Sequence, residues 1–260
     1  SLKRKPHVMA FCETWTNSTT TDDKLSVPGY TMRSRHDRLD TTGGRGGGLL
    51  VYVDSKITAY EEQTAFTKAV NQCTCVRINV KNRSFKLFNV YRSPNSLPDN
   101  DDALDKLIRS ADRESIFVGD FNYGNIDWNR STASDYQSRL FLEACEDNFL
   151  IQHVHFATRK ERLLDLVLSA DQELISDVRC AGKLGSSDHD ALMFNINSSP
   201  KSTNPSKQRV PDFKKANWSA LADDLSVRSW GEDFSGMTVD EMWLHFKRVV
   251  QEASANHIPL

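Results

Sequence analysis

The stretch Ile116-Phe117-Val118-Gly119-Asp120-Phe121-Asn122 decides the fold. Its continuous apolar run predicts a buried strand, and the glycine permits a turn or a close approach at the strand's end. Because side chains alternate along a strand, Asp120 and Asn122 should share one side while Phe121 returns to the core. Polar groups at the carboxyl end of a buried strand indicate an active site of an α/β sheet. The alternative is an Asp/Asn-rich turn that merely ends the strand.

Composition narrows the class of protein. The chain has 260 residues and a net charge of -2, so it has no global basic field. The absence of this field excludes a simple histone-like DNA-binding protein, but it does not exclude an enzyme that contacts a few phosphates. The five cysteines are odd in number and lack zinc-ligand spacing, which predicts reduced, intracellular thiols. No apolar run is long enough for a membrane span, and no signal peptide opens the chain. We therefore expect a soluble intracellular α/β protein without a membrane partner.

Further strands and helices surround the opening stretch. Two short patterns across a polar pair predict an antiparallel hairpin of Cys75–Val80 and Ser84–Tyr91. Amphipathic spacing predicts helices over Asp99–Asp112 and Ser134–Asp147. The other apolar runs predict strands over His7–Cys12, Leu49–Val53, Leu163–Ser169 and Ala191–Ile196.

A glycine cluster, Gly43–Gly48, precedes the Leu49–Val53 run. Such a cluster permits close backbone approach to a ligand or to a neighbouring strand. It does not form a phosphate-binding loop, because no Gly-Lys-Ser/Thr and no helix pattern follow it. A tight connection between strands is the simpler interpretation.

Polar residues gather where the apolar strands end, and together they indicate one chemistry. Hard carboxylate oxygens without thiolate or multiple-histidine ligands favour Mg²⁺ or Mn²⁺ over zinc. Phosphodiester hydrolysis needs a water nucleophile, a charge clamp on the phosphate and help for the leaving oxygen. No Gly-x-Ser-x-Gly sequence for acyl transfer is present. The set consists of Glu13, Tyr91, Asp120, Asn122, Asp165, Asp188 and His189.

Ordered motifs give a resemblance to a known family. The chain resembles the endonuclease/exonuclease/phosphatase superfamily with its DNase I-like fold. More narrowly, it is similar to the apurinic-type endonuclease domain of non-LTR (LINE-like) retrotransposons. The resemblance implies a four-layer α/β sandwich, in which two packed mixed β-sheets are flanked by helices. It covers about residues 6 to 197 and rests on Cys12-Glu13-Thr14-Trp15, GGRGGGLLVYV from Gly43, Val90–Asn95, GDFNYGNIDW from Gly119, Ala157-Thr158-Arg159, RLLDLVLS from Arg162 and Ser187-Asp188-His189.

The resemblance implies roles for the central residues. Glu13 would hold the divalent metal, Mg²⁺ or Mn²⁺. Asp120 would orient or activate the attacking water, and Asn122 would position that water and contact the phosphate. His189, oriented by Asp165, would contact a scissile phosphate oxygen and stabilise its charge.

The resemblance also implies supporting roles around the centre. Tyr91 would hydrogen-bond the same phosphate, and Asp188 would support the metal side or the water. Thr158 and Ser187 would contact the phosphate or support groups that do. Arg45 is a candidate contact to the DNA backbone, and a solvated loop charge is the alternative for it.

Relatives of this kind begin with a strand that carries a metal-binding Asn and with a helix. Here Lys3–Pro6 already matches the segment before the Glu13 strand. The resemblance thus implies a chain that lacks the first strand, leaves a sheet position unfilled, and has weakened or no activity.

The end of the chain changes in composition. We expect the endonuclease domain over residues 1–197, a Ser/Pro/Asn/Lys-rich linker over 198–211 and a helical extension over 212–260. Helical patterns cover Trp218–Leu225 and Val239–Ala253. The resemblance implies that the extension is a connector to a reverse transcriptase domain, in a parent polyprotein that acts in the nucleus.

Three functions compete. The resemblance favours a metal-dependent endonuclease that nicks DNA to prime reverse transcription of its own element. A phosphomonoesterase on the same fold would need a lipid- or nucleotide-specific insertion, and none is evident. A non-catalytic remnant that only binds is the third interpretation; the intact set of polar residues argues against it, whereas the missing first strand argues for it.

Overall fold

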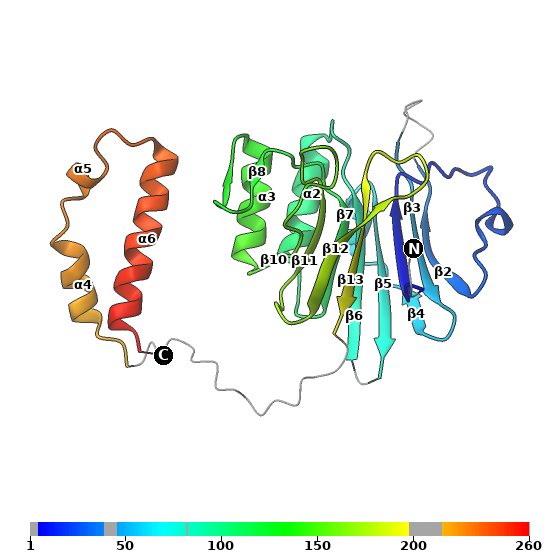
Figure 1. The fold of residues 1–260 in the computed structure, drawn as a ribbon, viewed down its shortest axis with the longest axis horizontal. Helices are drawn as coiled ribbons and strands as arrows, with labels where there is room; N and C mark the ends of the chain where they lie inside the picture. Colours follow the sequence, from blue (N-terminus) through cyan, green and yellow to red (C-terminus); the bar gives the residue numbers. More distant parts are fainter. Residues whose placement is uncertain (1–4, 39–45, 82, 198–214, 260) are drawn as a thin grey trace. The chain divides into compact units, whose positions relative to one another are not determined.

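A computed structural model describes residues 5–38, 46–81, 83–197 and 215–259. The chain divides into two compact units, Ser1–Ser199 and Pro200–Leu260 (Figure 1), and each unit is described by itself. The predicted linker over 198–211 lies outside the described residues, as does Arg45.

A six-stranded mixed sheet organises the first unit. The opening stretch forms its strand β7, at Ser115–Asp120, and β7 pairs in parallel with β6 and antiparallel with β11. The predicted hairpin is confirmed, because β5 and β6 are antiparallel neighbours. The order of the strands is β10 (Ile151–Gln152), β11 (Asp165–Ser169), β7, β6 (Arg83–Tyr91), β5 (Cys73–Val80) and β4 (Thr58–Glu61).

Smaller sheets accompany the six-stranded one. The order β1-β3-β2 places β1 (Val8–Cys12) at the edge of an antiparallel sheet, beside β3 (Leu49–Asp54), with β2 (Tyr30–His36) beyond. Two hairpins pair β12 (Ile175–Lys183) with β13 (Asp190–Ile196), and β8 (Ile126–Asp127) with β9 (Thr132–Ala133). Within the described residues, β1 and β13 thus each pair on one side only.

The two faces of the six-stranded sheet bury two separate cores, because its side chains alternate in direction. Phe88 and Phe117 stack at 4.5 Å between ring centroids on the helix side, where Leu104 of α2 (Pro98–Arg109) and Phe141 of α3 (Tyr136–Asp147) join the same cluster. The short helix α1 (Ala65–Ala69) precedes β5. Val51 of β3, with other residues of β3, β12 and β13, packs into the cluster on the opposite face.

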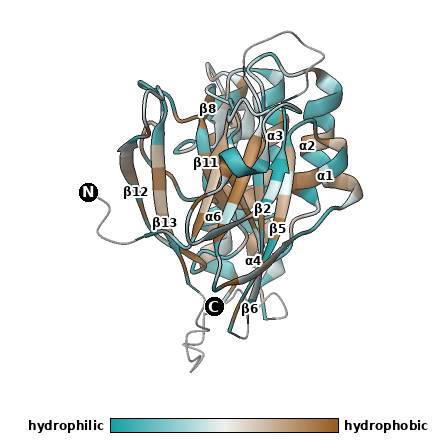
Figure 2. Cartoon of the chain, turned by 90° about the vertical axis from the view of Figure 1, so that its right-hand side faces the viewer, coloured by the Kyte–Doolittle hydropathy of each residue, from teal (hydrophilic) through white to brown (hydrophobic). Residues whose placement is uncertain are grey.

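Figure 2 shows the same alternation as brown and teal segments along the strands and helices. Several β-sheets with helices against them make the fold mixed α/β, as predicted from the sequence. Within the described part of this unit, the helices α1 to α3 lie on the face of the six-stranded sheet that carries the Phe88–Phe117 stack. The cluster on the other face consists of strand and loop residues.

Gly119 shows why the opening stretch needs a glycine. Its φ is 131°, and an added Cβ would lie 2.0 Å from the backbone oxygen of Val90. A close approach of two strands at the end of β7 therefore excludes any side chain there. Phe121, two residues on, is completely buried in the helix-side core, as predicted.

The second unit is helical, as its sequence pattern predicts. It contains α4 (Trp218–Ser226), α5 (Trp230–Asp233) and α6 (Val239–His257). Thr238 and Glu241 form a capping box at the start of α6. Trp230 contacts Phe246 at 5.5 Å between ring centroids, which joins α5 to α6. No helix among the described residues is long and apolar enough to cross a membrane.

Candidate active site

Three adjacent strands deliver three of the predicted residues to one edge of the six-stranded sheet. Tyr91 ends β6 and Asp120 ends β7, and the parallel register places them opposite each other. Asp165 begins β11 and is the antiparallel partner of Asp120. The sheet topology alone therefore brings together a phenol and two carboxylates that are distant in the sequence.

His189 joins the two carboxylates from the turn before β13. Its Nδ1 lies 2.8 Å from Asp165 Oδ2, and its Nε2 lies 3.8 Å from Asp120 Oδ2. Because a carboxylate can only accept, Nδ1 carries the proton and Asp165 fixes the orientation of the ring. Asp165 thus holds the imidazole through Nδ1, and Nε2 lies on the side of Asp120.

Burial and mutual repulsion shift the proton affinities of this group. Asp120 is 3% exposed, and burial together with the charge of Asp165 raises its pKa to about 7. The hydrogen bond to Asp165 raises the pKa of His189 above its ordinary value. Near neutral pH the centre thus combines a carboxyl group poised to take a proton and an imidazole that tends to be charged.

Glu13 reaches the same edge from the end of β1. The Tyr91 hydroxyl donates a hydrogen bond to Glu13 Oε1 at 2.7 Å. Burial of the phenol and, to a smaller extent, this hydrogen bond raise the pKa of Tyr91. Glu13 takes a φ of 53°, in the region that disfavours side chains. Gly46 lies against the pair, since a Cβ there would be 3.1 Å from the Tyr91 hydroxyl. Gly46 thus permits a close approach to the Glu13–Tyr91 pair of the candidate site.

Asn122 departs from the predicted alternation. Strand β7 ends at Asp120, and Asn122 has a φ of 53°, so the period of two does not extend to it. Its backbone N–H donates to Asp120 Oδ1 at 3.1 Å, and its Nδ2 donates to the carbonyl oxygen of Arg92 at 2.8 Å. The side-chain amide of Asn122 is therefore fixed through its nitrogen. It lies next to Asp120, the carboxylate that it is predicted to assist.

The supporting residues lie in two connected turns. Thr158 is completely buried, and its hydroxyl accepts the backbone N–H groups of Leu164 and Asp165 at 3.1 and 3.0 Å. Ser187 accepts the backbone N–H of His189 at 3.1 Å. Both hydroxyls hold the backbone that carries the Asp165–His189 pair.

Asp188, predicted to support the metal side or the water, forms an ion pair with Arg159. The Arg159 Nε and Nη2 atoms each lie 2.7 Å from Asp188 Oδ2, and this contact lowers the pKa of Asp188. Reasoning from the sequence did not single out Arg159 as a site residue, although the Ala157–Arg159 motif contains it. Its position after Thr158 was the available signal.

Reasoning from the sequence also missed Arg92, which packs behind the centre. Its side chain is buried, pairs with Asp101 through Nε and Nη2 at 2.8 Å each, and lies over the ring of Tyr123 at 4.1 Å. Its backbone N–H donates to the carbonyl oxygen of Asp120 at 2.8 Å. Arg92 therefore fixes the backbone that holds Asp120 and Asn122.

The donor atoms fit a divalent cation. One ligand atom from each of Asp120, Asp165 and His189 lies within 4.8 Å of the others, in a group that could hold a metal ion. The hydrogen bond between His189 Nδ1 and Asp165 Oδ2 already occupies those two atoms, which leaves Asp120 to supply a hard oxygen ligand. Glu13, the residue predicted to hold the metal, is not one of the three residues of this group. A dication would relieve the repulsion that raises the pKa of Asp120.

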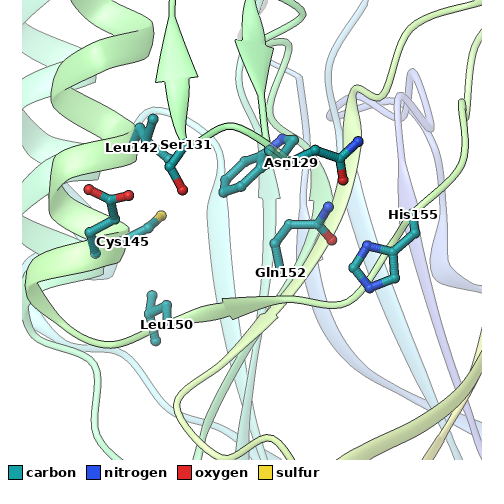
Figure 3. A pocket seen from close by; sticks show the side chains of 9 residues that line it. Asn129, Ser131, Leu142, Cys145, Leu150, Gln152 and His155 are labelled. Atoms are coloured by element: carbon teal, nitrogen blue, oxygen red, sulfur yellow. The ribbon is translucent and has the colours of Figure 1, made fainter. Parts of the chain in front are cut away.

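A separate pocket of about 180 Å³ lies beside α3 (Figure 3). Side chains from α3, β10 and the β8–β9 turn surround it, Cys145 and Gln152 among them (Figure 3). Its lining contains none of the residues predicted for the active site.

Comparisons with known proteins give a family match over the middle of the chain. The family described as endonuclease-reverse transcriptase matches residues 85–193, which include β6, β7, β11 and the His189 turn. No curated protein matches the chain.

Solved structures share the fold at low identity. One is the endonuclease domain of TRAS1, a telomere-specific non-LTR retrotransposon, with a TM-score of 0.51 and 17% identity over 65% of this chain and 81% of that domain. The 3′ phosphatase NExo from Neisseria, bound to a product DNA hairpin, has a TM-score of 0.55 and 14% identity over 75% and 90%. An AP endonuclease from Archaeoglobus fulgidus has a TM-score of 0.50 and 13% identity over 74% and 89%. The chain thus shares the DNase I-like fold of these structures, and the endonuclease-reverse transcriptase family model matches its residues 85–193.

Proposed function

We propose that this chain is a metal-dependent DNA endonuclease of a non-LTR retrotransposon, which nicks target DNA to prime reverse transcription. The observation that carries the proposal is the His189 imidazole, held by Asp165 through Nδ1 with Nε2 on the side of Asp120. The match to the endonuclease-reverse transcriptase family supports the link to reverse transcription.

Hydrolysis at this centre depends on four groups, each with its own role. Asp120, with a pKa near neutrality, accepts a proton from the water that attacks phosphorus. The protonated His189 donates from Nε2 to a non-bridging phosphate oxygen and stabilises the charge that develops there. Asp165 keeps the ring in the orientation and protonation state that this donation requires. Asn122 positions the water beside Asp120.

Glu13, Tyr91 and a divalent cation complete the proposed site. Glu13 would hold the divalent cation, Mg²⁺ or Mn²⁺, with Asp120 facing the same space. When bound, the cation supplies Lewis-acid charge that stabilises the phosphate and the departing oxygen. Tyr91 donates to Glu13 in the structure and is close enough to turn its hydroxyl to the phosphate. A polymerase needs a 3′-hydroxyl as primer, so the bond that breaks is the one between phosphorus and the 3′ oxygen.

The partners and the place of action are part of the same proposal. The substrate is double-stranded DNA, so the protein acts in the nucleus of its host. We propose that the helical unit, with α4, α5 and α6, connects the nuclease to a reverse transcriptase domain of the same polyprotein. Within the described residues β1 pairs on one side only, and we propose that a strand added on its other side would make nicking faster.

The test compares DNA nicking with phosphomonoester hydrolysis. Supercoiled plasmid in Mg²⁺ should be converted to the nicked circle, and DNA polymerase should extend the nick without prior treatment. EDTA should stop the reaction. If a 3′-phosphorylated oligonucleotide is dephosphorylated while the plasmid stays supercoiled, the chain is a phosphomonoesterase. If the protein binds DNA but cleaves neither substrate, with or without an added strand before β1, it is a non-catalytic remnant.

A further inference from the structure

Arg159 is a fixed cation beside the candidate active site. Its Nε and Nη2 both contact the same oxygen, Asp188 Oδ2, at 2.7 Å. Among the described residues, Asp188 is the side chain with which it pairs, and this arrangement leaves Nη1 available. Asp188 immediately precedes His189, so the guanidinium is tied to the residue next to the imidazole.

The backbone around Arg159 is hydrogen-bonded to the segments that carry Asp165 and His189. Thr158 and Arg159 both donate to the carbonyl oxygen of Arg162, at 2.9 and 3.1 Å, in a tight turn. The Thr158 carbonyl accepts the backbone N–H of Asp190, at the start of β13, at 2.8 Å. The Thr158 hydroxyl accepts the N–H of Asp165. Arg159 therefore has a defined position relative to both Asp165 and His189.

Exposure increases in steps from the centre to this pair. The side chain of Asp120 is 4% exposed and that of His189 is 20%, whereas those of Arg159 and Asp188 are 38% and 55% exposed. The reacting phosphate has to reach the buried carboxylate. The Arg159 guanidinium lies on the solvent-exposed rim, where the strand on either side of the scissile bond must pass.

The electrostatics of the centre create a need for such a cation. The hydrogen bond to Asp188 raises the pKa of Arg159, and the charges of Asp120 and Glu13 raise it further. Arg159 in turn lowers the pKa of His189, against the larger effect of Asp165. The guanidinium is thus within electrostatic reach of the whole acidic centre. Carboxylates repel an approaching phosphodiester, and a fixed positive charge at the rim offsets that repulsion.

We propose that Arg159 binds a phosphate of the cleaved strand next to the scissile one, and that Asp188 is a positioning residue that aims the guanidinium. This inference rests on the proposed nuclease function and extends it to a second phosphate subsite. Guanidinium is suited to the task, because it donates to two phosphate oxygens at once and remains charged at any working pH. Contacts of this kind set the register of the duplex on the enzyme and carry no base preference.

The test measures DNA binding without turnover, for Arg159→Ala, Arg159→Lys and Asp188→Asn. Arg179 and Asp177 form a similarly exposed ion pair on β12, with Nη1 and Oδ2 2.9 Å apart, so Arg179→Ala and Asp177→Asn are matched controls. Affinity for a short duplex is determined in EDTA across a salt series, and steady-state nicking is determined in Mg²⁺. Thermal melting confirms that each variant is folded.

We expect Arg159→Ala to weaken duplex binding about tenfold and to reduce the slope of log K against log salt by about one, relative to Arg179→Ala. Its KM should rise by a similar factor with kcat within about twofold. Arg159→Lys should restore the salt slope, because the charge is kept. Asp188→Asn should weaken duplex binding more than Asp177→Asn and leave the Mg²⁺ concentration for half-maximal nicking unchanged.

The outcomes separate this inference from the function on which it rests. Equal affinity and equal salt slope for Arg159→Ala and Arg179→Ala, in a protein that nicks DNA, would overturn the second subsite alone. A shift of the Mg²⁺ dependence in Asp188→Asn would return Asp188 to the metal side and overturn its positioning role. A wild-type chain that neither binds nor nicks DNA would remove the nuclease proposal itself.

Discussion

Replacing Asp120 by Asn should abolish activity and, at the same time, stabilise the first unit. Asp120 is 3% exposed, and its pKa is raised by burial and by Asp165. Folding therefore favours the protonated carboxyl group, and ionisation of this group at neutral pH opposes folding. Asparagine has the same shape, carries no charge and can still accept the N–H of Asn122 through its own oxygen.

The size of the effect comes from proton linkage. The pKa rises from its ordinary value of 3.8 to about 7, and each unit corresponds to about 1.4 kcal/mol. Stability from the neutral group is complete below the unfolded-state pKa near 4 and is lost as the pH rises to about 7. The upper limit is thus about 4 kcal/mol at pH 8. We expect about 2 kcal/mol, because relaxation of the structure and water penetration around the ionised carboxylate reduce the cost of burying its charge.

The free energy of unfolding is measured by urea titration in EDTA at pH 5 and pH 8. Hydrogen exchange of peptides from β7 and β11 monitors the unfolding. These peptides report the first unit alone. Asp120→Asn should exceed the wild type in unfolding free energy at pH 8, and the gap should shrink at pH 5. Asp102→Asn, at an exposed position of α2, is the control and should show no such pH-dependent gap. Adding Mg²⁺ should stabilise the wild type more than the variant.

Two results would refute this reasoning. One is an Asp120→Asn variant that is less stable than the wild type at pH 8. The other is a stability gap that stays constant between pH 5 and pH 8, which would mean that the charge of Asp120 opposes folding at neither pH.

Further predictions concern the same strands. The pH profile of kcat/KM should be bell-shaped: activity rises as Asp120 ionises near pH 7 and falls as His189 loses its proton above its raised pKa. Added Mg²⁺ should move the acid limb to lower pH, and a profile flat from pH 5 to 9 would contradict both assignments. Asp165→Asn should lower kcat about 100-fold or more and move the alkaline limb to lower pH, because the hydrogen bond that raises the pKa of His189 weakens; an unmoved limb would contradict the pairing. Gly119→Ala should destabilise the fold by about 3 kcal/mol or more, measured by urea unfolding. Gly182→Ala, where the φ is 80° but no atom lies within 4 Å of the added Cβ, should cost about 1 kcal/mol and serves as the control.

The centre of the fold was predictable because its strands are marked by continuous apolar runs. Tyr91 and Asp120 end their strands and Asp165 begins its strand, and these strand ends meet at one sheet edge, which brings the polar residues together. The six-stranded sheet, its hairpin and the helices α2 and α3 arise from the same short-range patterns. The resemblance implied that Asp165 orients His189, and the structure places His189 Nδ1 2.8 Å from Asp165 Oδ2.

Other features depend on tertiary contacts that no local pattern reveals. Strand β2 carries three half-buried or buried cationic and polar residues, Arg33, Ser34 and Arg35, in place of an apolar run. Strand β12 is exposed along most of its length, so it lacks hydrophobic periodicity. The positive φ of Asn122 breaks the alternation of β7. The ion pair of Arg159 with Asp188 joins residues that are 29 positions apart, and charge pairing at that separation has no sequence signature.

The most direct test of the central claim is the rate at which the chain nicks supercoiled plasmid in Mg²⁺, measured beside His189→Ala and Arg179→Ala. We expect the chain and Arg179→Ala to nick at the same rate, even if that rate is low. His189→Ala should be slower by about 100-fold or more, with DNA affinity in EDTA within a few-fold of the wild type. If His189→Ala nicks as fast as Arg179→Ala, the centre formed by Asp120, Asp165 and His189 does not perform the hydrolysis.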